Sequence, residues 1–323
     1  MKPAQDRIRT AVAASLPPGY GAITRWSRPR QGDWSWMFEA ETGGAAPATF
    51  VVKVPRWEEA PDLGAALNAG PQQDTEEEYR ALESIAAAVA AAGDPGLTAV
   101  VPVAYVREVN AVVTERLRAV PLHERLRRTR AADAAALFRR VGRWLRVFHA
   151  TSDPQLIPFE AEEFEQLADA GRRGALGDAI AAVAAAARVR SGRPVSVGVL
   201  HGDFSLRNVL VTIDDRVAVI DPNRYRGRIA GDASHLLTEV RLGRRQLITS
   251  GAFRARSRVE QWAAAIIDGY PEIDGGALAF ERAVAAVKRW VEVEERTKGI
   301  ARLALLPARR LLKSEVGALL RQI

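Results

Sequence analysis

Three oxygen-bearing side chains follow two expected strands, and their types suit phosphoryl transfer. Asp203 and Asn208 are five residues apart after a strand expected at 197–200, and Asp221 ends a strand expected at 217–220. Phosphoryl transfer needs a carboxylate that takes the proton of the acceptor hydroxyl, and oxygen ligands that hold magnesium on the phosphates. Magnesium prefers hard oxygen ligands of this kind. We therefore expect the three side chains to converge on one pocket; the alternative is an acidic surface loop between two strands.

The same segment resembles the catalytic loop of the aminoglycoside phosphotransferase and choline kinase family, a branch of the protein-kinase-like fold. The family pattern His-x-Asp-x4-Asn is matched by His201, Asp203 and Asn208, and an Ile-Asp pair follows with Asp221 thirteen residues further on. The resemblance implies that Asp203 is the catalytic base and that His201 braces the loop. It also implies that Asn208 and Asp221 hold Mg2+, so that ATP and Mg2+ are the cofactors.

A charged residue in an otherwise apolar run, Lys53, agrees with this resemblance. It lies in a β-branched segment expected to form a strand at 49–54. Lys53 resembles the strand lysine that contacts the α- and β-phosphates of ATP. The alternative is a lysine kept on an edge strand for solubility.

The resemblance asks for a glutamate partner of Lys53 on the helix expected at 74–92. Helical spacing favours Glu78, because it shares one face with three apolar residues, Leu82, Ile85 and Val89. If Glu78 does not pair with Lys53, Glu77 is the alternative partner. A further alternative is that Glu78 closes a capping box with Thr75 at the start of the helix.

Two more nucleotide contacts are expected from position alone. Residues 114–117 follow a strand and precede the helical half of the chain, and they resemble the interlobe hinge. Backbone groups of Glu115 and Leu117 are then expected to bond the adenine edge, although the segment can equally be a simple connector. The loop at 28–35 is expected to cover the phosphates, with Gly32 as its glycine and no GxGxxG pattern.

Other residues near the loop have both a functional and a plain interpretation. Asp232 resembles the family aspartate that bonds the backbone of the catalytic loop, and a helix N-cap explains it equally well. Ser205 stands where many protein kinases have a lysine. Arg207 is therefore the candidate that neutralises the transferred phosphate; the alternative is that it is a solvent-facing loop arginine. The sequence Asp-Pro-Asn at 221–223 replaces Asp-Phe-Gly, which argues against a protein-kinase-style switch.

Length and composition limit the class of protein. The 323 residues are 48% hydrophobic and 26% charged, which is typical of a globular chain large enough for two lobes. Cysteine is absent, which excludes disulfides and thiol catalysis and suits a cytoplasmic location. The longest apolar run has nine residues, too few to span a bilayer. Of the net charge of +7, +6 lies in residues 296–323, so a nucleic-acid-binding body is not expected.

The expected elements indicate an α+β, two-lobed protein-kinase-like fold. Residues 1–116 form a nucleotide-binding lobe with one main helix and strands expected at 23–26, 35–40, 49–54, 100–107 and 111–115. Residues 117–323 form a larger helical lobe, with helices expected at 131–150 and 160–190 and a helical remainder after 220. We expect the chemistry where the lobes meet.

The family resemblance implies that the acceptor is a small-molecule hydroxyl compound, such as an aminoglycoside, a sugar or an amino alcohol. A neutral or anionic acceptor suits the arginines that follow the metal motif, Arg224, Arg226, Arg228, Arg241, Arg244 and Arg245. A cationic acceptor would instead need the acidic residues before the loop, Glu160, Glu162, Glu163, Glu165 and Asp169, which otherwise read as a solvated helix face.

The C-terminal segment leaves two further alternatives open. Its apolar stripe with basic neighbours suits either weak contact with an anionic membrane or packing on its own domain; the stripe is Leu312, Val316, Leu319, Leu320 and Ile323. The first would suit a kinase of a lipid-linked or anionic carbohydrate. A non-catalytic nucleotide-binding protein on the same fold is the other alternative.

Overall fold

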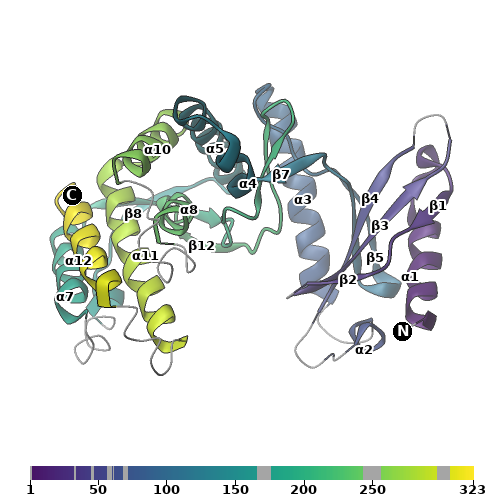
Figure 1. Cartoon of the computed structure of the whole chain (residues 1–323), viewed down its shortest axis with the longest axis horizontal. Helices are drawn as coiled ribbons and strands as arrows, with labels where there is room; N and C mark the ends of the chain where they lie inside the picture. Colours follow the sequence, from purple (N-terminus) through teal and green to yellow (C-terminus); the bar gives the residue numbers. More distant parts are fainter. Residues whose placement is uncertain are drawn as a thin grey trace. The chain divides into compact units, whose positions relative to one another are not determined.

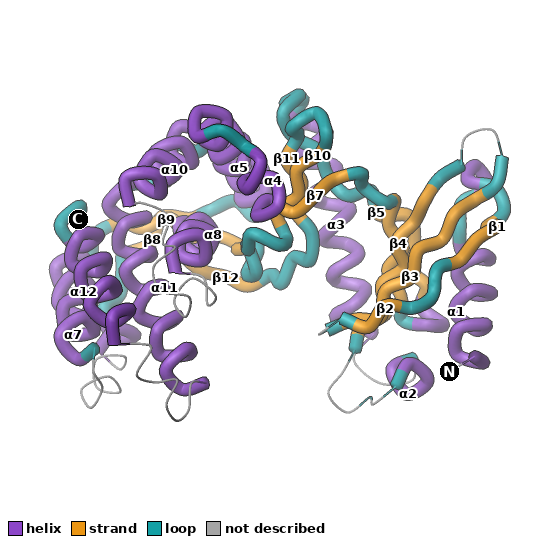
Figure 2. The backbone as a smooth tube through the Cα atoms, viewed as in Figure 1, coloured by secondary structure: helices purple, strands orange, loops and turns teal. Residues whose placement is uncertain are grey.

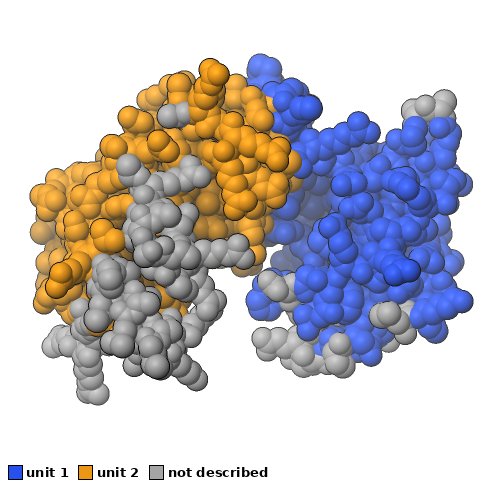
Figure 3. All heavy atoms as spheres, in the orientation of Figure 1, with its two compact units in different colours: residues 1–119, 212–214, 218–222 blue, residues 120–211, 215–217, 223–323 orange. Residues whose placement is uncertain are grey.

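The computed structural model describes residues 2–32, 34–44, 47–56, 60, 62–67, 72–165, 176–242, 256–296 and 306–323. The chain divides into two compact units (Figure 3). Unit 1 comprises residues 1–119, 212–214 and 218–222, and unit 2 comprises residues 120–211, 215–217 and 223–323. Asp221 therefore belongs to unit 1, although His201, Asp203 and Asn208 belong to unit 2.

Unit 1 is built on an antiparallel sheet of six strands with the order β1-β3-β4-β6-β5, in which β2 pairs with β3 (Figure 2). The strands are β1 (Ile23–Trp26), β2 (Arg30–Gln31), β3 (Ser35–Thr42), β4 (Thr49–Pro55), β5 (Pro102–Val106) and β6 (Ala111–Glu115). The expected strands agree with these closely, and those over 23–26 and 111–115 have the same bounds. The strand β2, paired with β3, lies within the loop expected at 28–35.

Two helices cover the opposite faces of this sheet (Figure 1). The helix α3 (Gln72–Ala92) lies on one side, and its apolar face is buried as the spacing predicted. The helix α1 (Lys2–Ser15) lies on the other side, where Ile8 and Val12 are fully buried against the sheet core. The sequence predicted one prominent helix here and missed α1, because only two of its side chains form the buried stripe. A short helix, α2 (Leu63–Ala66), lies between β4 and α3.

Unit 2 is mainly helical. Its helices are α4 (Leu122–Arg128), α5 (Ala131–Ala150), α7 (Gly177–Arg190), α8 (Ala230–Leu242), α10 (Arg256–Gly269), α11 (Gly275–Arg296) and α12 (Leu306–Leu320). The helix α5 packs along α10, and α11 packs against both α8 and α12. The expected helix over 131–150 has the bounds of α5.

Two three-stranded sheets lie outside the six-stranded one; the sequence predicted two of their strands, over 197–200 and 217–220, and missed the other four. One sheet has the order β12-β9-β8, formed by β12 (Tyr225–Arg228), β9 (Pro194–Leu200) and β8 (Gln155–Pro158). A second has the order β11-β10-β7, formed by β11 (Val217–Val219), β10 (Val209–Thr212) and β7 (Ala119–Pro121). The prediction of a helical remainder after residue 220 was therefore wrong at β12, which is held in a strand by pairing with β9 over four residues.

The helix expected over 160–190 is described in part. Its second half is α7, whereas residues 166–175, and with them Asp169, lie outside the described residues. Arg244 and Arg245 lie outside them as well.

The C-terminal stripe is buried inside unit 2. Leu312, Val316 and Leu319 on α12 are each at most 2% exposed, and they join a core cluster with α7 and α11. Glu315, on the same helix, is buried and accepts hydrogen bonds from Arg241 and Arg256, both at 3.0 Å. This arrangement favours packing on the chain's own domain over contact with a membrane. No helix in the described ranges is long and apolar enough to cross a bilayer.

Candidate active site

In unit 1, Lys53 lies between two carboxylates. The alternating burial of β4 points Phe50, Val52 and Val54 to the buried face of the sheet and Lys53 to the other. Its Nζ donates to Glu78 Oε1 at 2.7 Å and to Asp221 Oδ1 at 2.9 Å. Because β4 is an interior strand and the Lys53 side chain is only 21% exposed, Lys53 is not a solubility lysine on an edge.

The alternatives for Glu78 are decided by its neighbours on α3. Glu77 accepts a hydrogen bond from Gln73 Nε2 at 2.9 Å, so it does not replace Glu78. Thr75 is the fourth residue of α3 rather than its cap, and among the described residues its buried hydroxyl has no hydrogen-bond partner. The capping-box interpretation is therefore wrong.

The two carboxylates determine the charge of Lys53. Burial by itself would lower the pKa of the ammonium, but the charges and hydrogen bonds of Glu78 and Asp221 outweigh it and raise the pKa above its ordinary value. Lys53 is therefore a fixed positive charge at neutral pH, suited to an anionic ligand.

Asp221 reaches Lys53 from a turn with unusual backbone geometry. The residue has φ of 58°, in the left-handed region that costs most residues energy and that aspartate tolerates better than most. Conformations of this kind are concentrated at functional sites. The turn follows β11, whose three residues are all buried, so a rigid strand holds the Asp221 side chain in place.

In unit 2, the five-residue spacing of the motif closes a tight loop. Asn208 Nδ2 donates to Asp203 Oδ2 at 2.9 Å and to the Asp203 carbonyl at 3.0 Å. The backbone N–H groups of Asn208 and Val209 both donate to the Ser205 carbonyl. These bonds leave Asp203 Oδ1 and Asn208 Oδ1 to face other partners.

Asp232 supports the loop by accepting hydrogen bonds from its backbone. This residue is 2% exposed, and it accepts hydrogen bonds from the backbone N–H of His201 at 2.7 Å and of Gly202 at 3.1 Å. It lies in the first turn of α8 rather than before it, so the N-cap alternative is wrong. His201 is fully buried in contact with the rings of Trp144 and Phe204, which suits a bracing role.

The sequence analysis did not identify two residues that support the loop, His149 and Glu239. His149 Nε2 lies 3.0 Å from Asp232 Oδ2, and Glu239 Oε2 accepts from the Leu206 backbone N–H at 2.6 Å. Glu239 had a usable signal, because it follows Asp232 by seven residues and so shares its face of α8. His149 had none, because no local pattern links the end of α5 to α8.

The remaining candidate residues form fewer interactions with other side chains. Arg207 is exposed and forms no ion pair with any described residue. Gly32 lies in the β2–β3 hairpin, where its N–H donates to the Ser35 carbonyl at 2.8 Å. Leu117 lies beyond the end of β6 and is partly buried.

Glu115 is the last residue of β6, and its backbone N–H donates to the Val101 carbonyl. Its side chain accepts a 2.6 Å hydrogen bond from Tyr20 Oη, which raises the pKa of Tyr20 to about 12.

The structure thus gathers the candidates into two groups. Lys53, Glu78 and Asp221 meet in unit 1, and Asp203 and Asn208 meet in unit 2 on the support of Asp232. The convergence of the two groups on one pocket stays a prediction. Within the described chain, no cluster of three histidine or acidic residues forms a metal site by itself.

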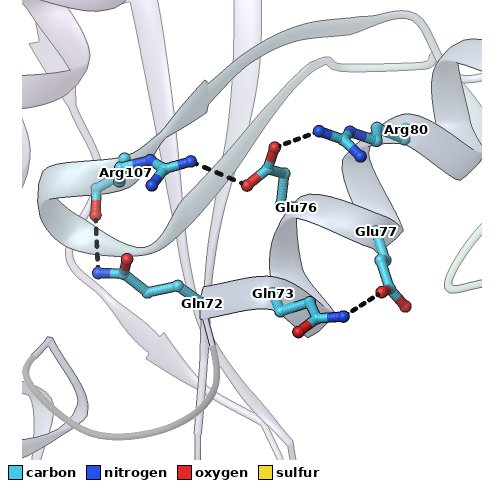
Figure 4. Close-up of a pocket in the computed structure, with 6 residues that line it drawn as sticks. All are labelled: Gln72, Gln73, Glu76, Glu77, Arg80 and Arg107. Atoms are coloured by element: carbon cyan, nitrogen blue, oxygen red, sulfur yellow. Dashed lines mark hydrogen bonds and ion pairs between the residues drawn. The ribbon is translucent and has the colours of Figure 1, made fainter.

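A separate cavity of about 330 Å³ lies at the start of α3 (Figure 4). Its lining residues are Gln72, Gln73, Glu76, Glu77, Arg80 and Arg107. Glu76 is paired with both Arg80 and Arg107, and Glu76 and Arg80 lie on the face of α3 away from Glu78. The cavity is therefore distinct from the Lys53 site.

Comparison with known proteins identifies the class. The chain belongs to the phosphotransferase enzyme family, whose model matches residues 27–275. No curated protein matches the sequence.

Solved structures share its fold at low identity. The choline kinase LicA from Streptococcus pneumoniae is 13% identical, with a TM-score of 0.52 over 97% of this chain and 99% of its own. A choline/ethanolamine kinase family protein from Mesorhizobium loti is 16% identical, with a TM-score of 0.54 over 98% and 99%. The spectinomycin phosphotransferase APH(9)-Ia, in complex with ADP and spectinomycin, is 13% identical, with a TM-score of 0.54 over 98% of both chains. The expected α+β, protein-kinase-like fold is confirmed.

Proposed function

We propose that this protein is an ATP- and Mg2+-dependent O-phosphotransferase that moves the γ-phosphate of ATP to a hydroxyl of a small molecule. The observation that carries the proposal is the position of Lys53 between Glu78 and Asp221. A partly buried lysine paired with two carboxylates, one of them on a left-handed turn, is an arrangement that a phosphate-binding site uses. Membership of the phosphotransferase family agrees.

On the nucleotide side, Lys53 contacts the α- and β-phosphates, and Glu78 keeps its ammonium in place. The backbone of Glu115 and Leu117 bonds the adenine edge, and the hairpin at Gly32 covers the phosphates. The solved spectinomycin phosphotransferase of similar fold, in complex with ADP, supports a nucleotide ligand.

On the acceptor side, Asp203 takes the proton of the hydroxyl group. Asn208 Nδ2 donates to Oδ2 of the Asp203 carboxylate. This bond fixes the orientation of the carboxylate and leaves Oδ1 to accept the proton of the hydroxyl group. Asp232 and Glu239 fix the loop through its backbone and His149 bonds Asp232, which keeps Asp203 in one orientation. Arg207 is exposed beside this loop and neutralises negative charge on the transferred phosphate.

The donor set fits a magnesium ion. Asn208 uses its Nδ2 for Asp203, which leaves the amide oxygen as a ligand atom, and Asp221 uses Oδ1 for Lys53, which leaves Oδ2. Both are hard oxygen atoms of the type that magnesium binds. The bound ion would neutralise charge on the phosphates.

The C-terminal helix α12 gives no support for a membrane-bound acceptor. Because the apolar stripe of α12 is buried in unit 2, it does not favour a lipid-linked acceptor. The acceptor we propose is therefore a dissolved small molecule, and the cytoplasm, as the ATP-containing compartment, is the proposed location.

The decisive experiment compares the wild type with Asp203→Asn. We expect the variant to keep the thermal stabilisation that ATP and Mg2+ confer, and to lose ADP release in the presence of a panel of sugars, aminoglycosides and amino alcohols by about 10²- to 10⁴-fold, the range of general-base catalysis. Asp268→Asn, an exposed aspartate on α10, is the matched control and should behave as the wild type.

Two results would contradict the proposal. Turnover that survives in Asp203→Asn would show that Asp203 is not the base. Nucleotide binding without turnover in the wild type, over the whole panel, would favour the non-catalytic nucleotide-binding protein.

A further inference from the structure

An exposed aromatic ring lies beside the catalytic loop. Tyr225 is the first residue of β12 and pairs with Leu200, the last residue of β9 before the loop. It is 54% exposed. Asn223, two residues earlier, donates its N–H to the His201 carbonyl at 2.8 Å, so this segment runs directly alongside the loop that carries Asp203.

Two glycines support this ring. A Cβ at Gly202 would lie 3.0 Å from Tyr225 Cδ1, and a Cβ at Gly227 would lie 3.4 Å from Tyr225 Cε2. Cδ1 and Cε2 are opposite corners of the ring, so the ring extends from one glycine to the other. Gly202 also has a positive φ of 85°, whereas Gly227 does not, and at Gly227 the missing side chain alone makes room for Tyr225 and Leu200.

A flat, half-exposed ring on a backbone floor is suited to stack against another ring. Aromatic side chains provide a large apolar contact while keeping a polar atom in water. Burial, followed by the charges of Asp232 and Glu281, raises the pKa of Tyr225, so its hydroxyl is neutral and can donate a hydrogen bond. Asp203 follows Gly202 directly, which places the base next to a molecule stacked on Tyr225.

The carboxylates around β12 are already engaged. Arg228 binds Glu281 and, at 2.7 Å, Glu163, so the acidic segment before the loop is partly neutralised from within. Asp232 and Glu239 accept hydrogen bonds from the loop backbone. These four carboxylates are therefore not presented to a cationic acceptor.

The arginines of the same segment are exposed. Arg224 forms no ion pair or hydrogen bond within the described part of unit 2, and Arg226 donates to the neutral amide of Gln155 at 3.0 Å. Arg207 is exposed on the loop itself. The charges that act on the Tyr225 hydroxyl itself are mainly acidic, and Arg226 points to the opposite face of β12, where it bonds Gln155. Arg224 is therefore the exposed cation of this segment that is available to an anionic group.

We propose that Tyr225 is the floor of the acceptor site, with Arg224 at its rim, and that the acceptor is a hydroxylated, sugar-like ring with an acidic group. The proposal rests on the proposed function and specifies its substrate class. The ring face stacks on Tyr225, the acidic group binds Arg224, and a hydroxyl of the ring faces Asp203.

Three pyranoses that differ mainly in one group test this class: D-glucuronate, D-glucose and D-glucosamine. We measure ADP release with each, and binding of each by saturation-transfer NMR. We expect kcat/KM and binding to fall in that order, with glucuronate favoured over glucosamine by at least about tenfold, which corresponds to ~1.4 kcal/mol. Arg224→Ser should reduce this preference, whereas Arg193→Ser, an exposed arginine before β9, should not.

The ring is tested by Tyr225→Ala and Tyr225→Phe. The alanine variant should raise the acceptor KM by about tenfold, or ~1.4 kcal/mol, and the phenylalanine variant should keep stacking and stay near the wild type. Leu156→Ala removes a 74% exposed apolar side chain from β8 in the same sheet and is the matched control. Thermal stabilisation by ATP and Mg2+ should be equal in all four proteins.

Each contrary outcome points to a different failure. Absence of both nucleotide stabilisation and ADP release would overturn the proposed function, while the NMR experiment would still test the Tyr225 floor. Absence of binding by all three pyranoses, equal binding in the wild type and Tyr225→Ala, or a preference for glucosamine would overturn the acceptor site proposed here.

Discussion

The support of the loop at 201–208 by one buried aspartate is open to a direct test, the substitution Asp232→Asn. Both carboxylate oxygens of Asp232 are used: Oδ2 accepts from the N–H of His201 and lies 3.0 Å from His149 Nε2, and Oδ1 accepts from the N–H of Gly202. Asparagine offers one acceptor oxygen and one NH2 group. At least one buried donor of the loop would therefore face another donor.

The size of the effect follows from these contacts. A hydrogen bond to a charged group contributes ~1.5–3 kcal/mol, and a buried N–H left without a partner costs ~1–3 kcal/mol. We expect Asp232→Asn to lower the free energy of unfolding by about 3 kcal/mol. For a unit of this size one kcal/mol corresponds to roughly 2–4 °C, so the unfolding midpoint should fall by about 6–12 °C.

The assay is thermal unfolding followed by circular dichroism, with turnover measured at a temperature where all proteins are folded. Turnover should fall as well, because Asp203 loses its fixed position. Asp268→Asn, whose side chain is 58% exposed in a surface ion pair, should shift the midpoint by less than about 2 °C. A shift equally small in Asp232→Asn would refute the view that this aspartate holds the loop.

Three other predictions concern separate parts of the chain. Lys53→Met should abolish thermal stabilisation by ATP and Mg2+, because it removes the paired ammonium; stabilisation that persists would contradict its phosphate-binding role. In thermal unfolding, Gly202→Ala should destabilise unit 2 far more than Gly192→Ala. Both glycines have positive φ, but only at Gly202 would the added Cβ lie 1.9 Å from a backbone oxygen, that of Asn223. Equal effects would show that this close approach does not matter. The hydrogen bond to Glu115 raises the pKa of Tyr20 to about 12, so its stabilising effect should be complete below pH 10 and lost as the pH rises toward 12. Denaturant midpoints over that range should fall more steeply in the wild type than in Tyr20→Phe, and parallel curves would contradict the coupling.

Part of the fold could be predicted because its signals are local. The strand over 49–54 is a β-branched run between prolines, and the helix α5 has apolar residues at helical spacing. By contrast, β12 has two arginines and a glycine among its four residues, and it is a strand only because β9 supplies hydrogen-bond partners. The helix α1 was missed for a similar reason, since two buried side chains leave a weak periodic signal.

The candidate site shows the same division. Helical spacing indicated Glu78 rather than Glu77, and the structure pairs Glu78 with Lys53. Nothing in the sequence indicated that His149 meets Asp232, because 83 residues separate them.

What the sequence by itself determined is the chemistry: the acid, amide and ammonium groups, their local spacing, and the strands and helices that carry them. These follow from residue types and from periodicity over a few residues. The tertiary structure alone decided which groups touch, such as Asp221 with Lys53, 168 residues apart, and the ring of Tyr225 on Gly202 and Gly227. Such contacts depend on how distant segments pack, and packing is a property of the whole chain that no local pattern contains.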